Sequence, residues 1–537
     1  MSPTPSGRRT PLAVLVSAVL AATVLAGCTA DPARPVTVAT TVRLDALDPV
    51  AATDPAAVAI LHQLYPRLLE LDSETGAIVP GLAESAAWES ETRYRVTIPA
   101  GLRFANDDRL TASDVAFSFE RQSDIPGGTA TAPLLSSLDS VEVVDETTVV
   151  FVLGQPDPSF PQALAGAAGA ILDEEVFSAD AVTEPAAVVA GGGFAGPLRL
   201  TSFDGRTAVF VASDDDPAAP AGRRLVLETG LSGEEAAGRL GAGADAVFGA
   251  LSAEQRASLL ARDGVTTRVQ PSGAVRLLAF DHGTQALSPQ DGGDAAKALA
   301  VRQAVADLID RAALAEAAPD AWVPEFRYLP AGLPVAGEES PWALSDPEAA
   351  AVRQGFGDGA GGADPERAAQ RLAAAGVPAP VRLVFSVVPA SDDPDADAIY
   401  DALEEQLEAD GLFDVVFREL TGEVDRELLS EERYPQLGLV WSPLGLGASS
   451  WFRPLYATEG MLSGVADGTT DELIGDLRAT ADPAAQAALV GRLEGRLAAR
   501  LPAIPLLSGQ YLLYLSPDAG EVGDIPELGW FEELGAR

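Results

Sequence analysis

The chain has 537 residues, and its 79 acidic residues against 36 Lys and Arg give a formal net charge of −43 at pH 7. This excess of carboxylates argues against nucleic acid and anionic lipid surfaces as partners, because both repel negative charge. Cys28 is the single cysteine, so no disulfide can form within the chain and the fold must depend on its apolar cores. A chain of this length is long enough for two or three domains.

The first 27 residues have the order of a secretory signal peptide: two arginines, an apolar run over 12–25, then small residues. The run is shorter than the roughly 20 residues that a transmembrane helix needs, which predicts a cleaved segment. The tetrapeptide LAGC at 25–28 resembles a bacterial lipobox. This resemblance implies that Cys28 receives a diacylglycerol and begins a lipidated tether, 28–35. A plain secretory peptide is the alternative, and export by the twin-arginine route stays open.

Segments with strand and helix character alternate along the rest of the chain. Four β-branched runs bounded by Gly, Pro or Asp predict strands, the second as a hairpin, at 94–98, 141–153, 208–213 and 380–388. Thr111 followed three residues later by Asp114 predicts a capped helix over 111–122. An Ala-rich segment predicts another helix over 295–317, and we interpret the Gly/Pro-rich stretch 330–364 as a surface excursion. The mixture predicts an α/β fold in at least two lobes.

Seven segments in this order carry a resemblance to a known family. The most specific is YRVTIPAGLRFANDDRLTASDVAFSFER at 94–121. The others are at 43–49 (RLDALDP, compared with an early strand), 64–90, 191–200, 301–310, 364–376 and 501–507. Together they resemble the extracellular solute-binding proteins of the peptide and nickel class, the receptors of ABC importers. The resemblance implies a two-lobed, periplasmic-binding-protein-like α/β fold that closes on its ligand about a hinge.

The family's usual layout implies the domain boundaries. After the signal peptide, 1–27, and the tether, a discontinuous lobe I comprises 36–47, 194–275 and 500–537, subdomain II comprises 48–193, and lobe III comprises 276–499. The resemblance also implies a monomer on the outer face of the bacterial cytoplasmic membrane. There it would capture a peptide or another small organic solute and deliver it to an ABC permease.

Most residues of the shared motifs are predicted to be scaffold. We expect Asp107 and Asp114 to serve a turn and a helix start. We expect the aromatic side chains to lie in the core: Trp88, Tyr94, Phe104, Phe117 and Phe119.

The ligand site is where this chain departs from the family. Peptide-binding members commonly have, after a tryptophan in the second lobe, an aspartate that pairs with the ligand's ammonium group. The matching segment is 437–460, which keeps Trp441 but has Pro443 and Leu444 where the acidic residue would stand, and 433–458 holds no carboxylate. A buried ammonium without an anionic partner is costly, so we expect a ligand other than a standard free-amine peptide.

The candidate ligand contacts in this segment are Trp441, Ser442, Ser449, Ser450, Trp451 and Arg453. Aromatic faces, hydroxyls and one guanidinium suit a sugar-like, amide or carboxylate-bearing ligand. The alternative is that Trp451 and Phe452 pack a helix onto the lobe and that Arg453 is a surface residue. Further contacts implied by the family are Asp45, Leu47 and Asp48.

Catalysis finds little support in the sequence. His62 and His282 are far apart, neither has neighbours at metal-ligand spacing, and no nucleophile elbow or P-loop is present. The Gly-x-Gly-x-x-Gly pattern at 357–362 and the calcium-loop-like DDPDADA at 392–398 are interpreted as chance. We therefore expect no enzymatic activity, no metal and no cofactor. A sensor or adhesin that kept the receptor fold, or a hydrolase, are the alternatives.

Overall fold

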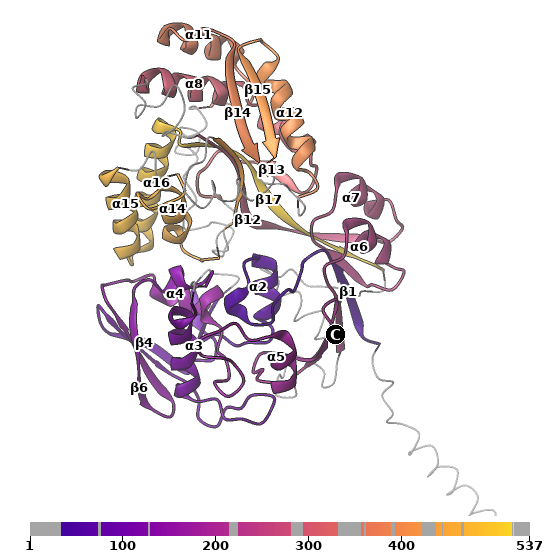
Figure 1. The fold of residues 1–537 in the computed structure, drawn as a ribbon, viewed down its shortest axis with the longest axis vertical. Coiled ribbons are helices and arrows are strands. Elements are labelled where there is room, and N and C mark those ends of the chain that lie inside the picture. The colour runs from indigo at the N-terminus through magenta and orange to yellow at the C-terminus, as the bar shows by residue number, and fades with distance from the viewer. Residues whose placement is uncertain are drawn as a thin grey trace, which may run out of the picture. The chain divides into compact units, whose positions relative to one another are not determined.

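The computed structural model describes residues 34–72, 77–126, 129–213, 224–280, 294–330, 356–358, 361–387, 393–419, 436–442, 444–462, 467–517 and 519. The chain divides into two compact units, Met1–Pro35 and Val36–Arg537. The helices and strands named below lie in the second unit (Figure 1). The predicted lipidation site, Cys28, and the signal peptide lie outside the described residues. No helix within the described ranges is long and apolar enough to span a bilayer.

A four-stranded antiparallel sheet is formed early in the chain. Its order is β4 (Ser85–Ser90), β5 (Arg93–Thr97), β7 (Thr148–Leu153) and β6 (Leu138–Asp145). Helices α3 (Ala112–Asp124) and α4 (Phe160–Ala165) share its apolar cluster, the small-sheet core, which includes Tyr94, Val96, Val115, Phe119, Phe151, Phe160 and Leu164. A separate hairpin consists of β2 (Leu69–Leu71) and β3 (Ile78–Pro80).

Within the described residues, an 11-stranded mixed sheet joins segments from most of the chain. Its order is β15 (Phe413–Glu419), β14 (Val381–Val387), β16 (Gln436–Trp441), β12 (Thr266–Phe280), β17 (Ala503–Leu515), β11 (Ala246–Phe248), β1 (Val36–Thr40), β10 (Arg224–Glu228), β9 (Thr207–Ala212) and β8 (Leu198–Phe203). The remaining strand, β13 (Trp322–Pro324), pairs with β17.

The two longest strands, β12 and β17, run antiparallel through the middle of this sheet. One end of β17 pairs with β11, at 513–515. At the other end of the β12–β17 pair, residues 275–280 of β12 pair with β16, which joins the pair to the C-terminal strands. Between Pro271 and Val275 the register of β12 against β17 is irregular. The two strands thus connect the N-terminal and C-terminal parts of the sheet.

Two apolar cores support the N-terminal part of the sheet. The first, called here the N-terminal core, unites β1 and β8–β10 with α2 (Pro55–Leu61) and α5 (Pro185–Gly191). The second is smaller and joins β11 with α6 (Gly233–Arg239) and α7 (Ala253–Leu260).

Two further cores support the C-terminal part. The first packs β14 and β15 with α8 (Ala295–Leu308), α9 (Arg311–Glu316), α11 (Pro365–Ala375) and α12 (Ala396–Glu408). Of these, α8, α11 and α12 lie beside β14 and β15 in Figure 1. The second, called here the helical core, packs β12 with α14 (Ala448–Tyr456), α15 (Gly468–Ala479) and α16 (Pro483–Arg500).

The α/β prediction is confirmed, and most predicted elements are present. Thr111 and Asp114 form the expected capping box of α3, in which the Asp114 carboxylate accepts from the Thr111 amide at 2.8 Å. The hairpin of β6 and β7 turns at Glu146 as predicted. The four predicted strand regions correspond to β5, β6 with β7, β9 and β14.

Three expectations about local structure were wrong. The predicted helix over 295–317 is two helices, because Ile309 is extended and Asp310 caps α9. The early strand is β1, whereas most of 43–49 is irregular and Pro49 begins a 3-10 helix, Pro49–Ala51. Trp88 is not core but 38% exposed, since β4 is an edge strand, although its ring packs on Tyr94 with centroids 4.8 Å apart.

The other predicted core aromatics are buried or packed on a core. Phe104 and Phe119 are buried, and Phe117 packs against the N-terminal core. Most of the predicted excursion at 330–364 lies outside the described residues.

Candidate functional site

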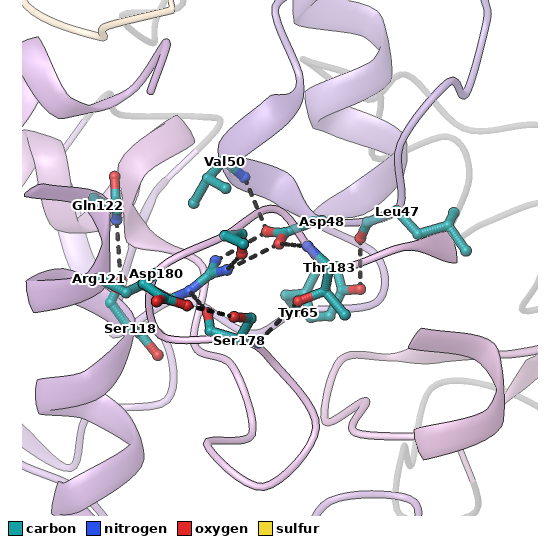
Figure 2. Close-up of polar contacts among 11 residues, drawn as sticks. Leu47, Asp48, Val50, Tyr65, Ser118, Arg121, Gln122, Ser178, Asp180 and Thr183 are labelled. Carbon is teal, nitrogen blue, oxygen red and sulfur yellow. Dashed lines mark hydrogen bonds and ion pairs between the residues drawn. The ribbon is translucent and has the colours of Figure 1, made fainter. Parts of the chain in front are cut away.

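A buried ion pair between Asp48 and Arg121 fixes the first predicted contact region (Figure 2). The Asp48 carboxylate accepts from both Nη atoms of Arg121, at 3.0 and 2.9 Å, and from the Thr183 amide at 2.8 Å. It also caps the 3-10 helix through the Val50 amide. Arg121 in turn donates from Nε to the Ser178 carbonyl at 2.9 Å. Both oxygens of Asp48 are therefore engaged inside the fold.

The other two candidates from the early part of the chain, Leu47 and Asp45, differ in exposure. Leu47 is fully buried in the N-terminal core, and its carbonyl accepts from the Tyr65 hydroxyl at 2.7 Å. Burial, followed by the nearby Asp48 charge, raises the pKa of Tyr65 well above its ordinary value, so the hydroxyl keeps its proton for this bond. Asp45 is exposed. Of the three early candidates, Asp45 alone presents its side chain to solvent.

Trp441 ends β16 and begins the segment where the second-lobe contacts were predicted. Its ring is half-buried against the helical core. Its indole Nε1 is buried and donates to no acceptor in the part of the chain that the structure describes. A buried donor without an acceptor is unfavourable for the fold. Ser442, the next residue, is half-buried.

Helix α14 carries the remaining second-lobe candidates, and most of them serve the fold. Trp451 and Phe452 are fully buried in the helical core, and the Trp451 indole donates to the Tyr328 carbonyl at 2.5 Å. Ser450 closes the first turn, because its hydroxyl accepts from the Gly447 amide at 3.1 Å. These contacts match the alternative in which α14 packs onto the lobe through its aromatic residues.

The other two α14 candidates are more accessible. Ser449 is half-buried, and Arg453 is exposed, with Nη1 at 3.2 Å from the Ser136 hydroxyl.

The segment between Trp441 and α14 contacts distant parts of the chain. Leu444 packs against the N-terminal core, and Leu446 packs against the small-sheet core. Arg478 of α15 also contacts a distant part of the chain, because it donates to Asp157, before α4, at 2.9 Å. Sequence reasoning missed Asp157 and Arg478, because 321 residues separate them and neither lies in a recognisable motif.

One acidic cluster has donor atoms close enough to hold a cation. Oxygen atoms of Asp114, Asp173 and Glu175 lie within 4.8 Å of one another. A hydrogen bond with Asp173, followed by burial, raises the pKa of Glu175 to about 7. Asp114 also caps α3, and Asp173 accepts from the Asn106 amide at 2.8 Å. These contacts give the cluster a structural explanation.

The histidines and the calcium-like stretch show no catalytic arrangement among the described residues. Burial, followed by the charge of Arg67, lowers the pKa of His62, which ends α2 as a neutral side chain. His282 lies outside the described residues. In 392–398, Asp395 pairs with Arg256 at 2.7 Å, which gives this stretch a role in packing.

Comparison with known proteins places most of the chain in one family. The family model for bacterial extracellular solute-binding proteins, family 5 Middle, matches residues 77–463. The chain belongs to the family 5 solute-binding proteins. The peptide transport periplasmic protein SapA of Salmonella typhimurium is 35% identical over 133 residues, which are 21% of this chain and 24% of that protein. The dipeptide-binding protein of Escherichia coli is 33% identical over 132 residues, again 21% and 24%. The match thus covers about a quarter of the length of these relatives.

Solved structures of binding proteins share the fold over nearly the whole chain. The dipeptide-binding protein of Pseudoalteromonas sp. SM9913, in complex with Met-Leu, has a TM-score of 0.71 at 18% identity and covers 92% of this chain and 98% of its own. AgaA of A. tumefaciens R10, in complex with agropinic acid, has a TM-score of 0.69 at 18% identity and covers 94% and 97%. At this identity the likeness shows the fold, which is that of two-lobed binding proteins.

Proposed function

We propose that this family 5 protein is the substrate-binding component of an ABC importer, which captures a small organic solute between two lobes and delivers it to a permease. The observation that carries the proposal is the family match over 77–463, together with a fold shared along nearly the full length of binding proteins. Binding proteins of this type hold and release their ligand unchanged. We accordingly propose no catalytic step, no cofactor and a monomeric receptor.

The lobes are proposed to follow the layout expected from the family. Lobe I comprises 36–47, 194–275 and 500–537, subdomain II comprises 48–193, and lobe III comprises 276–499. Support comes from the long β12 and β17 strands, which connect the two parts of the large sheet and lose regular register between Pro271 and Val275. A break of this kind lets two packed bodies turn about a short segment, as hinge closure requires.

The ligand is proposed to contact Trp441 and Ser442, with Ser449, Arg453 and Asp45 as further contacts. Support comes first from the Trp441 indole, a buried donor that a carbonyl or carboxylate oxygen of a ligand would satisfy. The buried contacts of Asp48, Leu47, Ser450 and Trp451 support structural roles, so these four are left out of the proposed contacts.

The ligand class is proposed to exclude solutes that depend on a buried ammonium pair. Leu444 stands where peptide-binding members commonly have an aspartate, and it packs against the N-terminal core. Among the similar structures, one protein is complexed with Met-Leu and another with agropinic acid, so the fold serves a peptide in one case and a different solute in the other. We propose a ligand rich in oxygen acceptors, such as an amide, a sugar-like solute or a carboxylate.

The location is proposed to be the outer face of the bacterial cytoplasmic membrane, through lipidation of Cys28. Support comes from the signal-like order of residues 1–27 and the LAGC tetrapeptide. The excess of carboxylates is compatible with a receptor held by its lipid, because the charged surface itself would be repelled by anionic headgroups.

A thermal-shift screen of residues 29–537 against peptides, acylated peptides, sugars and organic acids tests the proposal. At a concentration of 100 Kd, a ligand should stabilise the protein by about 2.7 kcal/mol, which raises the melting temperature by several degrees. Trp441→Phe should weaken binding about fivefold by removing one hydrogen bond. Trp88→Phe, which removes an exposed indole on β4, is the matched control and should bind as the unmodified protein does.

Two results would contradict parts of the proposal. Hits confined to free-amine peptides would contradict the ligand class while leaving the receptor function in place. Equal binding by the Trp441→Phe and Trp88→Phe variants would contradict the placement of the site.

A further inference from the structure

Residues 444–447, with the sequence Leu-Gly-Leu-Gly, connect β16 to α14 and reach across to other cores. β16 and α14 themselves belong to the C-terminal part of the fold. Leu444 nevertheless packs against the N-terminal core, and Leu446 packs against the small-sheet core. Leu444 and Leu446 of proposed lobe III are half-buried, and they pack against cores that residues of lobe I and subdomain II build.

The glycines of this segment allow its backbone to approach subdomain II closely. A Cβ atom on Gly445 would lie 2.5 Å from the Ser450 hydroxyl of α14 and 2.8 Å from Cδ2 of Leu134 in subdomain II. A Cβ atom on Gly447 would collide with Oε1 of Gln162. The alternation of leucine and glycine fits a segment that inserts side chains while its backbone lies close to side-chain ends of Leu134 and Gln162 in subdomain II.

A polar contact also joins proposed lobe III to subdomain II. Arg478, in the last turn of α15, donates from Nε to Oδ2 of Asp157 at 2.9 Å, and the two side chains are 16% and 6% exposed. The other oxygen of Asp157 accepts from the Ser159 hydroxyl at 2.6 Å, which holds the carboxylate in place. An ion pair this sheltered from water interacts more strongly than a surface pair.

We propose that residues 444–447 and the Asp157–Arg478 pair form a ligand-independent lock that keeps lobe III closed on subdomain II. Every contact of the lock joins groups of this chain, so the lock stabilises the closed form whether or not a solute is bound. Closure in the free protein would reduce the apparent affinity for any solute that must first enter an open cleft, because binding then draws on a minor population. The lock presupposes the two proposed lobes but no particular ligand.

A cysteine pair placed in the lock tests it directly. The chain from residue 29 to 537 contains no cysteine, so introduced thiols have no competitors. A Cβ atom on Gly166 would lie 3.4 Å from Cγ of Leu446, close to the spacing that a disulfide needs. The variant Gly166→Cys with Leu446→Cys, stripped of solute by unfolding and refolding, should lose both free thiols on mild oxidation as a monomer. The single variants should keep theirs.

Changes elsewhere in the lock separate its parts. In the double-cysteine protein, Arg478→Gln should slow disulfide formation about fivefold by opening the lobes. Arg382→Gln removes only an exposed pair with Asp414 inside proposed lobe III and, as the matched control, should leave the rate within about twofold. Thiols that stay reactive in the solute-free protein would overturn the lock, and so would equal rates for the two arginine variants.

Small-angle scattering of the cysteine-free protein gives a second test that needs no introduced thiol. Leu444→Asp with Leu446→Asp should increase the radius of gyration of the solute-free protein, because two buried carboxylates would expel the segment from its apolar contacts. Equal radii for this variant and the unmodified protein would overturn the lock. Neither measurement depends on finding a ligand, so failure of the lock is distinct from failure of the proposed receptor function.

Discussion

Replacement of Arg121 with methionine removes one half of the buried ion pair with Asp48. Their side chains are 1% and 0% exposed, so water solvates neither charge. Without the guanidinium, the carboxylate keeps only the backbone donors of Val50 and Thr183 for a buried negative charge. Breaking a buried pair by removing one partner costs about 3–5 kcal/mol of folding free energy.

Thermal unfolding followed by circular dichroism measures this loss. A change of 1 kcal/mol shifts the melting temperature of a domain of 150–250 residues by about 2–4 °C. Asp48 and Arg121 both lie in proposed subdomain II, 48–193, so for the unfolding of that domain a loss of about 3 kcal/mol predicts a fall of about 6–12 °C. Arg382 pairs with Asp414 at 3.0 Å, but their side chains are 68% and 46% exposed. Arg382→Met is the matched control, and because an exposed pair contributes about 0–1 kcal/mol, it should melt close to the unmodified protein.

The reasoning would be refuted if Arg121→Met melted at the temperature of the Arg382→Met control. A double variant extends the test. Asp48→Asn combined with Arg121→Met should lose less stability than the sum of the single losses, because the second change removes the charge that the first left unpaired. Additive losses would show that the two residues do not act as a pair.

Three further predictions concern single side chains. Burial raises the pKa of Glu325 from 4.5 to about 7, so between these pH values the folded state holds a proton that the unfolded state has released. Stability should therefore fall as pH rises from about 4.5 to 7, and Glu325→Gln should reduce this fall in melting temperature, leaving the share due to Glu175, whose pKa is raised to about 7 as well; parallel pH profiles would contradict it. Trp451→Phe should cost about 1–3 kcal/mol in urea unfolding through the lost bond to the Tyr328 carbonyl, whereas equal midpoints for this variant and Trp88→Phe would contradict the burial argument. Cys28→Ser in the full chain should abolish labelling with fatty acid and retention in the membrane fraction, and continued labelling would exclude the proposed anchor.

Signals that act over a few residues were readable from the sequence. Thr111 and Asp114 are three residues apart, and a capping box requires that spacing, so the start of α3 followed directly. The break between two helices at Ile309 and Asp310 was missed, although aspartate is a preferred N-cap residue and Asp310 caps α9. Trp88 was wrongly assigned to the core. Its strand lies at the edge of the sheet, and composition does not reveal the order of strands in a sheet.

Contacts that depend on the fold were not readable. Asp48 was expected at the ligand, but its partner Arg121 lies 73 residues away on α3 and no spacing links the two. The sequence shows that position 444 has leucine in place of an acidic residue. The packing of Leu444 against the N-terminal core, in contrast, depends on how the lobes meet. Whether the indole N–H of Trp441 finds an acceptor among the described residues likewise depends on which groups surround it in three dimensions.

Native mass spectrometry of residues 29–537, after incubation with a mixed panel of solutes, tests the central claim most directly. The receptor account predicts one solute per chain, released with its mass unchanged and retained less well by the Trp441→Phe variant than by the Trp88→Phe variant. A protein that retained no solute from the panel would contradict the receptor function, and a bound solute released with an altered mass would show that the chain is an enzyme.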